Sequence, residues 1–80
     1  MDKLLMPLSE ITNILNQDGM KLNKSKLYHY FRLGLLIPES TFVNSKTILF
    51  DFKDVKHRLK IISELNKKGY KLTEIVHKLT

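Results

Sequence analysis

The residues best suited to chemistry gather in one segment, Lys24–Leu33. Its charged, hydroxyl and imidazole groups are those of Lys24, Ser25, Lys26, Tyr28, His29 and Arg32. Lysine and arginine neutralise phosphates, whereas serine, tyrosine and histidine form hydrogen bonds with phosphate oxygens or base edges. The plainer interpretation is a solvated surface whose charges keep the protein in solution. We favour nucleic-acid contact, because basic, aromatic and hydrogen-bonding groups share one face of a predicted helix.

The residue pattern does not indicate a catalytic site or a metal site. The histidines at 29, 57 and 77 fall on separate predicted helices, and neither His-x3-His nor His-Glu-x-x-His spacing occurs. The chain contains no cysteine, which excludes thiolate ligands, disulfides and a cysteine nucleophile. Its 3 glycines each mark a turn or a helix end, so no glycine-rich phosphate loop is present. We therefore expect a protein that is not an enzyme and that needs neither metal nor cofactor.

Size and charge narrow the class of partner. The chain has 80 residues and is expected to form a single domain over 1–80. It carries 14 Lys and Arg against 8 Asp and Glu, a net charge of +6, which favours an anionic partner, with nucleic acid before a membrane surface. No apolar stretch is long enough to span a bilayer, and the N-terminus does not have a signal-peptide pattern. We expect a cytoplasmic, nucleoid-associated protein, or a nuclear one in a eukaryote.

Two helices are predicted in the first half of the chain. The segment Leu8–Leu15 has the apolar spacing of a helix, with Ser9 as its predicted N-cap. Its predicted core face is made by Leu8, Ile11, Ile14 and Leu15. The second helix, Lys24–Leu33, is predicted to be capped by Asn23 and ended by Gly34. Leu27, Tyr30 and Phe31 should face the core, whereas Tyr28 and His29 should point away from it.

A hairpin and two more helices are predicted in the second half. Residues 36–50 favour two strands with a turn at Asn44–Lys46. Asp51 should cap a third helix, Asp54 resembles the second half of a capping box, and Gly69 should end the helix. Thr73 should cap a short fourth helix. The predicted apolar faces are Phe52, Val55, Leu59, Ile62 and Leu65 in the third helix, and Leu72, Ile75, Val76 and Leu79 in the fourth.

Several short motifs follow one another in a fixed order over residues 8–79. They are Leu8-Ser9-Glu10-Ile11, then Arg32–Pro38, Leu49-Phe50, Asp54-Val55, Ile61-Ile62 and finally Leu65–Ile75. In order and spacing they resemble the DNA-binding domain of the MerR-type transcriptional regulators. The resemblance implies a mainly α fold with four helices and a small β-hairpin wing, the winged helix-turn-helix. It also implies that the second helix enters the major groove and that the wing contacts the neighbouring backbone or minor groove.

The resemblance assigns DNA contacts to individual residues. The groove face would be formed by Lys24, Ser25, Lys26, Tyr28, His29 and Arg32, and the wing tip by Asn44, Ser45 and Lys46. The chain departs from the family at some of these positions. Tyr28 replaces the usual arginine, His29 the usual tyrosine and Phe31 the usual glutamate, and the wing has Lys46-Thr47-Ile48 in place of glycine-tyrosine-arginine. The connection between the first two helices is also longer than in the family.

The function expected from this pattern is sequence-specific binding of double-stranded DNA, with a role in transcription regulation. One alternative is a DNA-architectural factor of the excisionase kind, and another is a winged-helix module that has lost DNA binding and binds a protein. RNA binding is a further possibility, since exposed aromatic groups stack on splayed bases. A protein partner or self-association on DNA would be compatible, whereas a membrane or a small-molecule effector is not expected. Because the chain stops at Thr80, before the family's long dimerisation helix, we expect either a piece of a longer protein or a small stand-alone protein.

Overall fold

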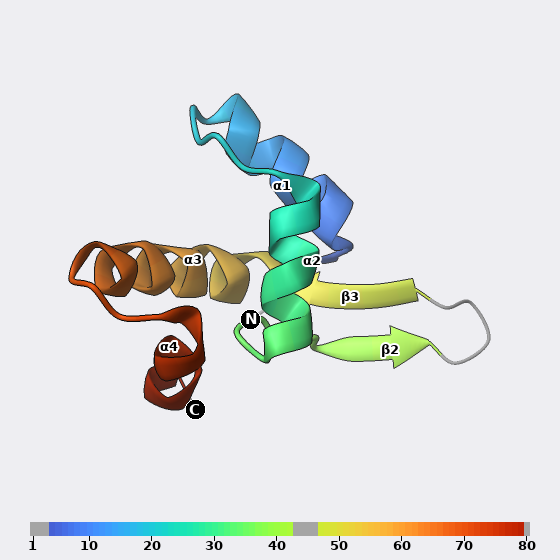
Figure 1. Cartoon of the computed structure of the whole chain (residues 1–80). Coiled ribbons are helices and arrows are strands. Elements are labelled where there is room, and N and C mark those ends of the chain that lie inside the picture. Colours follow the sequence, from blue (N-terminus) through green and yellow to red (C-terminus); the bar gives the residue numbers. More distant parts are fainter. Residues whose placement is uncertain (1–3, 43–46, 80) are drawn as a thin grey trace.

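The computed structural model describes residues 4–42 and 47–79, and in this part of the chain four helices combine with a small antiparallel sheet (Figure 1). The elements are β1 (Leu5–Met6), α1 (Leu8–Gln17), α2 (Lys24–Leu33), β2 (Ser40–Phe42), β3 (Thr47–Asp51), α3 (Phe52–Lys67) and α4 (Leu72–Leu79). The predicted order of two helices, a hairpin and two helices is confirmed. Strand β1 is an addition that the sequence pattern did not predict. Over the described residues, no helix has the length and apolar character needed to cross a membrane.

Helix α1 begins two residues earlier than its predicted cap allows. Its N-cap is Pro7, whose carbonyl accepts the amides of Glu10 and Ile11 at 3.1 and 3.2 Å. The prediction of Ser9 as N-cap is wrong, because Pro7 already holds the extended conformation that precedes a helix and Ser9 lies in the first turn. Proline has no side-chain acceptor, so this end of α1 has no side-chain cap.

The buried face of α1 also differs from the predicted one. Leu8, Ile11 and Leu15 are fully buried, whereas Ile14 is 36% exposed. Thr12 takes the remaining inward position and is 4% exposed. Its hydroxyl donates to the Leu8 carbonyl at 2.7 Å, so the buried polar group keeps a partner. A hydrogen bond within the helix thus lets a polar side chain occupy a core position.

Both ends of α2 match the prediction. The side-chain oxygen of Asn23 accepts the Ser25 amide at 2.8 Å, which satisfies one of the unpaired donors of the first turn. Gly34 ends the helix with φ of 88°, a left-handed conformation that favours glycine. The chain then turns so that the following residues, Leu35 and Leu36, are buried.

The sheet has the order β1-β3-β2, and both pairings are antiparallel. Strand β2 pairs with β3 in the register Ser40 to Leu49, which confirms the predicted hairpin, and β1 pairs with the end of β3 through Leu5 and Asp51. The predicted turn at Asn44–Lys46 lies outside the described residues. In Figure 1 the β2–β3 hairpin extends to one side of α2, and α3 and α4 lie to the other.

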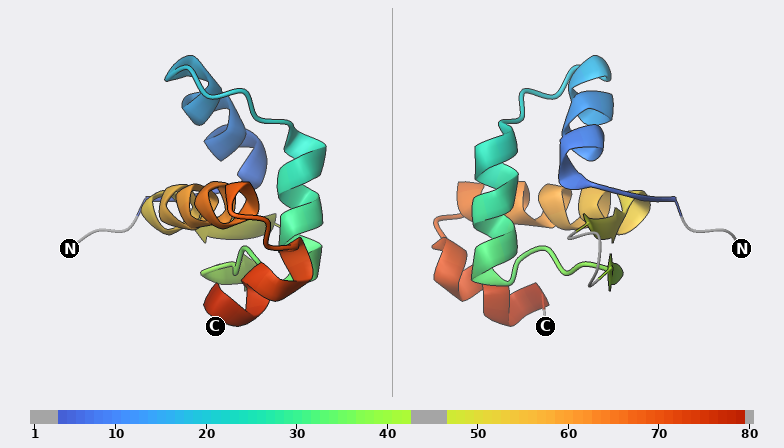
Figure 2. Two further views of the ribbon diagram at one scale, coloured as in Figure 1. Left: turned by 60° about the vertical axis from the view of Figure 1, so that its left-hand side comes forward. Right: turned by 90° about the vertical axis from the view of Figure 1, so that its right-hand side faces the viewer.

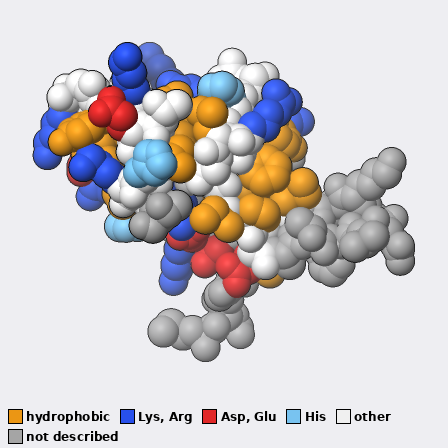
Figure 3. Space-filling view, turned by 60° about the horizontal axis from the view of Figure 1, so that its bottom comes forward, with side chains coloured by type: hydrophobic (Ala, Val, Ile, Leu, Met, Phe, Trp, Pro, Cys, Tyr) orange, Lys and Arg blue, Asp and Glu red, His pale blue; other side chains and the backbone are white. Residues whose placement is uncertain are grey.

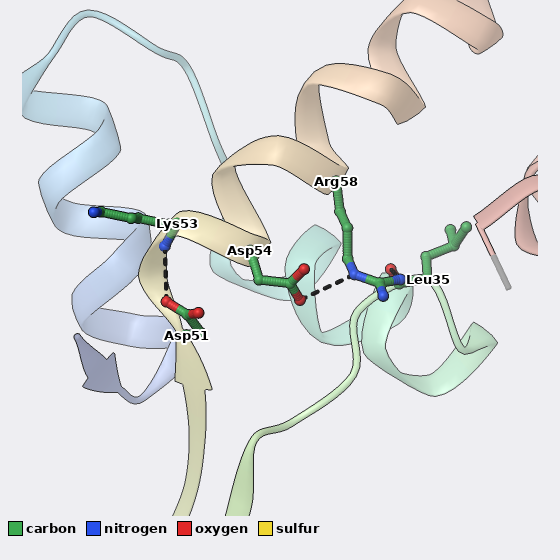
Figure 4. Close-up of polar contacts among 5 residues, drawn as sticks. All are labelled: Leu35, Asp51, Lys53, Asp54 and Arg58. Carbon is green, nitrogen blue, oxygen red and sulfur yellow. Dashed lines mark hydrogen bonds and ion pairs between the residues drawn. The ribbon is translucent and has the colours of Figure 1, made fainter. Parts of the chain in front are cut away.

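Helix α3 follows β3 without a linker. The Asp51 side chain accepts the Lys53 amide at 3.1 Å, which confirms the predicted cap (Figure 4). Asp54 was predicted to act in a capping box, but its carboxylate accepts a hydrogen bond from Arg58 Nε at 3.0 Å. The short aspartate side chain reaches the next turn of its own helix more easily than the backbone before it.

Helix α4 starts at Leu72, so the prediction of Thr73 as N-cap is wrong. Here the Glu74 side chain accepts the Lys71 amide at 3.1 Å, and Lys71 supplies the carbonyl for the first helical bonds. Ile75 is fully buried, and the rest of the predicted apolar face is partly buried. Helix α4 packs on α3 and touches α2 near its end (Figure 2).

The core joins all four helices to the sheet. In α3 the predicted stripe contributes Val55, Leu59 and Ile62, each at most 5% exposed, whereas Phe52 and Leu65 are only partly buried. The full set of buried apolar residues is Leu8, Ile11, Leu15, Leu27, Tyr30, Leu35, Leu36, Phe50, Val55, Leu59, Ile62 and Ile75. This core fixes one face of α2 and leaves its opposite face in solvent.

Candidate nucleic-acid interface

The solvent face of α2 carries four of the residues that the sequence pattern assigned to DNA contact. Leu27 and Tyr30 anchor the opposite face, at 0% and 7% exposure. Because an α-helix has 3.6 residues per turn, the positions facing away from this anchor form one surface. They are Lys24, Ser25, His29 and Arg32, and all four are exposed. Two permanent positive charges and two hydrogen-bonding groups therefore share one accessible surface.

Tyr28 lies at the border between this face and the core. The prediction that it points away from the core is wrong in part, because Tyr28 is half-buried and packs against the core cluster. The Lys24 ammonium lies 5.9 Å from the centroid of its ring, within the range of a cation–π contact. Tyr28 therefore positions Lys24 on one flank of α2.

Lys26 lies on the other flank of α2, apart from Lys24 and Tyr28. Its ammonium is 5.9 Å from the centroid of the Tyr30 ring. Lys26 and Tyr30 line a groove between α2, α3 and the connection that precedes α2. The six predicted contact residues on α2 are thus divided, with five on or beside the solvent face and Lys26 on the groove.

The first turn of α2 carries positive charges and no negative ones. The helix has Lys24 and Lys26 in its first turn and no acidic side chain anywhere in its sequence. The N-terminal end of a helix also carries partial positive charge from its unpaired amides. This arrangement is unfavourable for the isolated helix and favourable for an anion placed there. By contrast, Arg32 lies in the last turn, where its charge complements the helix dipole.

Contacts on the buried side hold α2 against the sheet. The Phe31 and Phe50 rings meet edge to face, with centroids 5.4 Å apart and an interplanar angle of 88°. Phe50 is 1% exposed and sits in the central strand β3. The orientation of α2 relative to the β2–β3 hairpin is therefore set by a packed aromatic pair.

A second tie joins the segment after α2 to α3. Arg58 Nη1 donates to the Leu35 carbonyl at 3.3 Å, while Arg58 Nε donates to Asp54 (Figure 4). The Arg58 side chain is only 16% exposed, so its charge is largely removed from solvent and is neutralised by Asp54. Arg58 is therefore a structural residue, and its charge is not available to a ligand in the way that the charge of Arg32 is.

Other candidate residues belong to the predicted wing tip and to α3. Asn44, Ser45 and Lys46 lie outside the described residues. Exposed lysines also occur on α3, at Lys53, Lys56, Lys60 and Lys67. Viewed with the lower side of Figure 1 brought forward, the molecule has Lys and Arg side chains around its edges and apolar side chains between them (Figure 3).

Side chains that could bind a metal are scattered over the described residues. Among them, no group of three or more His, Cys, Asp or Glu side chains is arranged to hold a metal ion. His29, His57 and His77 are exposed on α2, α3 and α4, respectively.

The groove beside Lys26 is a feature that the sequence pattern did not predict. Its walls come from three separate segments, so no local pattern could have revealed it.

Comparison with known proteins gives no further guide to the site. No protein-family model matches the chain, and neither a curated protein nor a solved structure shows significant similarity to it.

Proposed function

We propose that this chain is a winged helix-turn-helix domain of the MerR type that binds double-stranded DNA through α2. The observation that carries the proposal is the exposed, acid-free face of α2, with Lys24, Ser25, His29 and Arg32 on one side of a helix whose other side is fixed in the core. The adjacent β2–β3 hairpin has the place in the chain order that a wing has in this fold.

The side chains divide by the contact that each can make. Arg32 presents a planar guanidinium, which suits paired hydrogen bonds to guanine in the major groove. Lys24 lies at the positive end of α2, where a backbone phosphate would be held by charge and by helix amides together. Ser25 and His29 add hydrogen bonds to phosphates or base edges. The resemblance assigns a flanking phosphate contact to Lys46, which lies outside the described residues.

The biological role that fits this mode of binding is transcription regulation in the cytoplasm, at the nucleoid. A DNA-architectural role of the excisionase kind uses the same contacts. Selection of bound duplexes from a random pool separates the two by what is enriched. A single recurring sequence supports a regulator, and closely spaced direct repeats support head-to-tail assembly along DNA.

Salt dependence tests the contact with phosphates. If about 4–6 phosphates are neutralised, the logarithm of the binding constant falls against the logarithm of the salt concentration with a slope of roughly −4 to −5. Fluorescence anisotropy of a labelled duplex, titrated with the protein at several salt concentrations, measures this slope. Absence of binding to any duplex at low salt would reject the proposal. If single-stranded RNA binds more tightly than duplex DNA, the ligand of this domain is RNA.

A matched pair of double variants locates the interface. Lys24→Ala with Arg32→Ala removes two charges from the α2 face, and the affinity for duplex should fall at least about tenfold. Lys53→Ala with Lys60→Ala removes the same charge from exposed positions of α3 and should have a much smaller effect. Equal losses in both variants would show that binding follows net charge alone, and that α2 is not the reading element.

A further inference from the structure

The groove beside Lys26 combines an apolar surface with a basic rim. It has a volume of about 400 Å³, within the range of ligand-binding pockets. Met20 and Leu22 form one wall, and Leu59 of α3 lies in the lining. Met20 is 37% exposed and Leu22 is half-buried, so apolar surface remains accessible in the groove. A groove in which accessible apolar side chains lie among polar groups has the lining that a ligand side chain can fill.

Three lysines surround this apolar surface. Lys21 comes from the connection between α1 and α2, Lys26 from α2 and Lys67 from the end of α3, and all three are exposed. None of the described lining residues is acidic. No described carboxylate forms an ion pair with these lysines, since the ion pair within the described residues joins Arg58 and Asp54. The rim therefore carries positive charge that no described carboxylate neutralises.

The wall of the groove is held in place before any ligand binds. Asn16 clamps the backbone of Leu22 with two hydrogen bonds: its Oδ1 accepts the Leu22 amide at 2.7 Å, and its Nδ2 donates to the Leu22 carbonyl at 3.0 Å. The Met20 amide donates to the Leu15 carbonyl at 3.1 Å. These bonds fix the connection between α1 and α2 against α1. The wall is therefore ordered in the free protein, and a ligand does not have to order it on binding.

From these features we infer that the groove is a docking site for a protein segment in which an apolar side chain is flanked by carboxylates. The apolar side chain covers Met20 and Leu22, while the carboxylates pair with the rim lysines. The phosphates of duplex DNA match the rim, but its bases are stacked inside the double helix and do not project into a groove as an apolar side chain does. A second copy of this chain, at a net charge of +6, is repelled by the same rim.

The docking site is separate from the surface proposed to bind DNA. Lys26 contacts the Tyr30 ring and lines the groove, whereas Lys24 contacts the Tyr28 ring and does not line it. Ser25, His29 and Arg32 are outside the groove lining, so we expect a peptide in the groove to leave them accessible to a duplex. The inference goes beyond the proposed function, and it stands whether or not α2 contacts DNA.

The test uses the full chain, labelled with ¹⁵N, and synthetic peptides of defined composition. The probe peptide carries a leucine and a phenylalanine between pairs of glutamates. One control peptide replaces the glutamates by lysines, and another replaces the two apolar residues by serines. Only the probe should produce saturable amide shifts, and these should centre on residues 20–22, 26 and 59–67. Absence of saturable shifts with the probe, or equal shifts with the serine peptide, overturns the inference.

Variants separate docking from a general charge effect. Lys21→Glu with Lys67→Glu should weaken probe binding about tenfold, because two favourable ion pairs become repulsive contacts. Lys53→Glu with Lys60→Glu makes the same change of charge at exposed positions outside the groove and should alter binding by less than about twofold. If both double variants lose the same affinity for the probe, binding depends on net charge alone, and the inference is overturned.

Two further measurements test the apolar contact and the class of ligand. Met20→Gln keeps the size of the side chain but makes it polar, and it should weaken the probe by several fold. An unchanged affinity there contradicts the apolar contact. A duplex DNA titration should shift amides of Lys24, His29 and Arg32 and leave the bound peptide in place. If the duplex displaces the peptide and shifts the amide signals of the groove residues, the groove binds nucleic acid and the inference fails. If the duplex does not bind, the proposed function fails, and the result of the peptide titration still stands.

Discussion

The aromatic pair between α2 and β3 predicts a measurable coupling in stability. Replacing Phe50 by leucine removes roughly three methylene-sized groups from a site that is 1% exposed. At about 0.8 kcal/mol for each buried group, this change should cost roughly 2 kcal/mol. A chain of this length is expected to have about 4–12 kcal/mol of total stability, so the variant should remain folded. Phe31→Leu should cost less, because Phe31 is only partly buried.

The pair itself is isolated by a double-mutant cycle. The edge-to-face contact at 5.4 Å should contribute a coupling free energy of about 0.5–1.5 kcal/mol beyond the two single effects. Urea unfolding followed by far-ultraviolet circular dichroism gives the four free energies, with one common slope if all variants unfold in two states. A control cycle of Phe50→Leu with Lys60→Ala should give a value near zero. A Phe31–Phe50 coupling no larger than this control would refute the reasoning that the rings fix α2 on the sheet.

Three further predictions concern the packing and the helix ends. Ile62→Ala, at a site 2% exposed, should lower the free energy of unfolding by about 2–5 kcal/mol, measured by urea titration. Gly34→Ala should destabilise by about 1–2 kcal/mol through backbone strain alone, because an added Cβ would approach only Val76 Cγ1, at 3.9 Å. A loss below about 0.5 kcal/mol would contradict this origin. Asn23→Ala should lower the melting temperature by several degrees through loss of about 1 kcal/mol, whereas Ser9→Ala should leave it nearly unchanged, and the reverse order would contradict the observed caps.

The features that could be predicted from sequence are those set by a few neighbouring residues. Asn23 and Asp51 cap their helices because a side-chain oxygen reaches an amide two residues ahead. Gly34 ends α2 because its left-handed conformation disfavours side chains. The apolar spacing of α3 likewise identified its buried face. In each case the determinant and the structure lie within one or two turns of the chain.

The errors occur where another group competes for the same role or where distant segments meet. Ser9 and Thr73 have good capping side chains, but Pro7 and Lys71 precede them and begin the helices earlier. Strand β1 has only two residues, and it exists because β3, more than forty positions along the chain, offers its edge.

The candidate site shows the same division. The exposed face of α2 follows from helical spacing, and the sequence located four of its residues correctly as a group. The separation of Lys26 from Lys24 depends on which ring each ammonium meets, Tyr30 or Tyr28. The groove next to Lys26 requires the folded arrangement of three segments, so it could not be found from spacing.

The direct junction between β3 and α3 has a mechanical consequence. Asp51 is both the last residue of the strand and the cap of the helix, so no flexible joint separates the two elements. Strand and helix follow one another without a loop, and α3 alone extends about 24 Å at 1.5 Å per residue. The hairpin thus lies before the first turn of α3, and Lys67 at the rim of the groove lies at its last turn. No loop is present at this junction to absorb a change in the angle between hairpin and helix, and the buried Phe50 ring packs beside it.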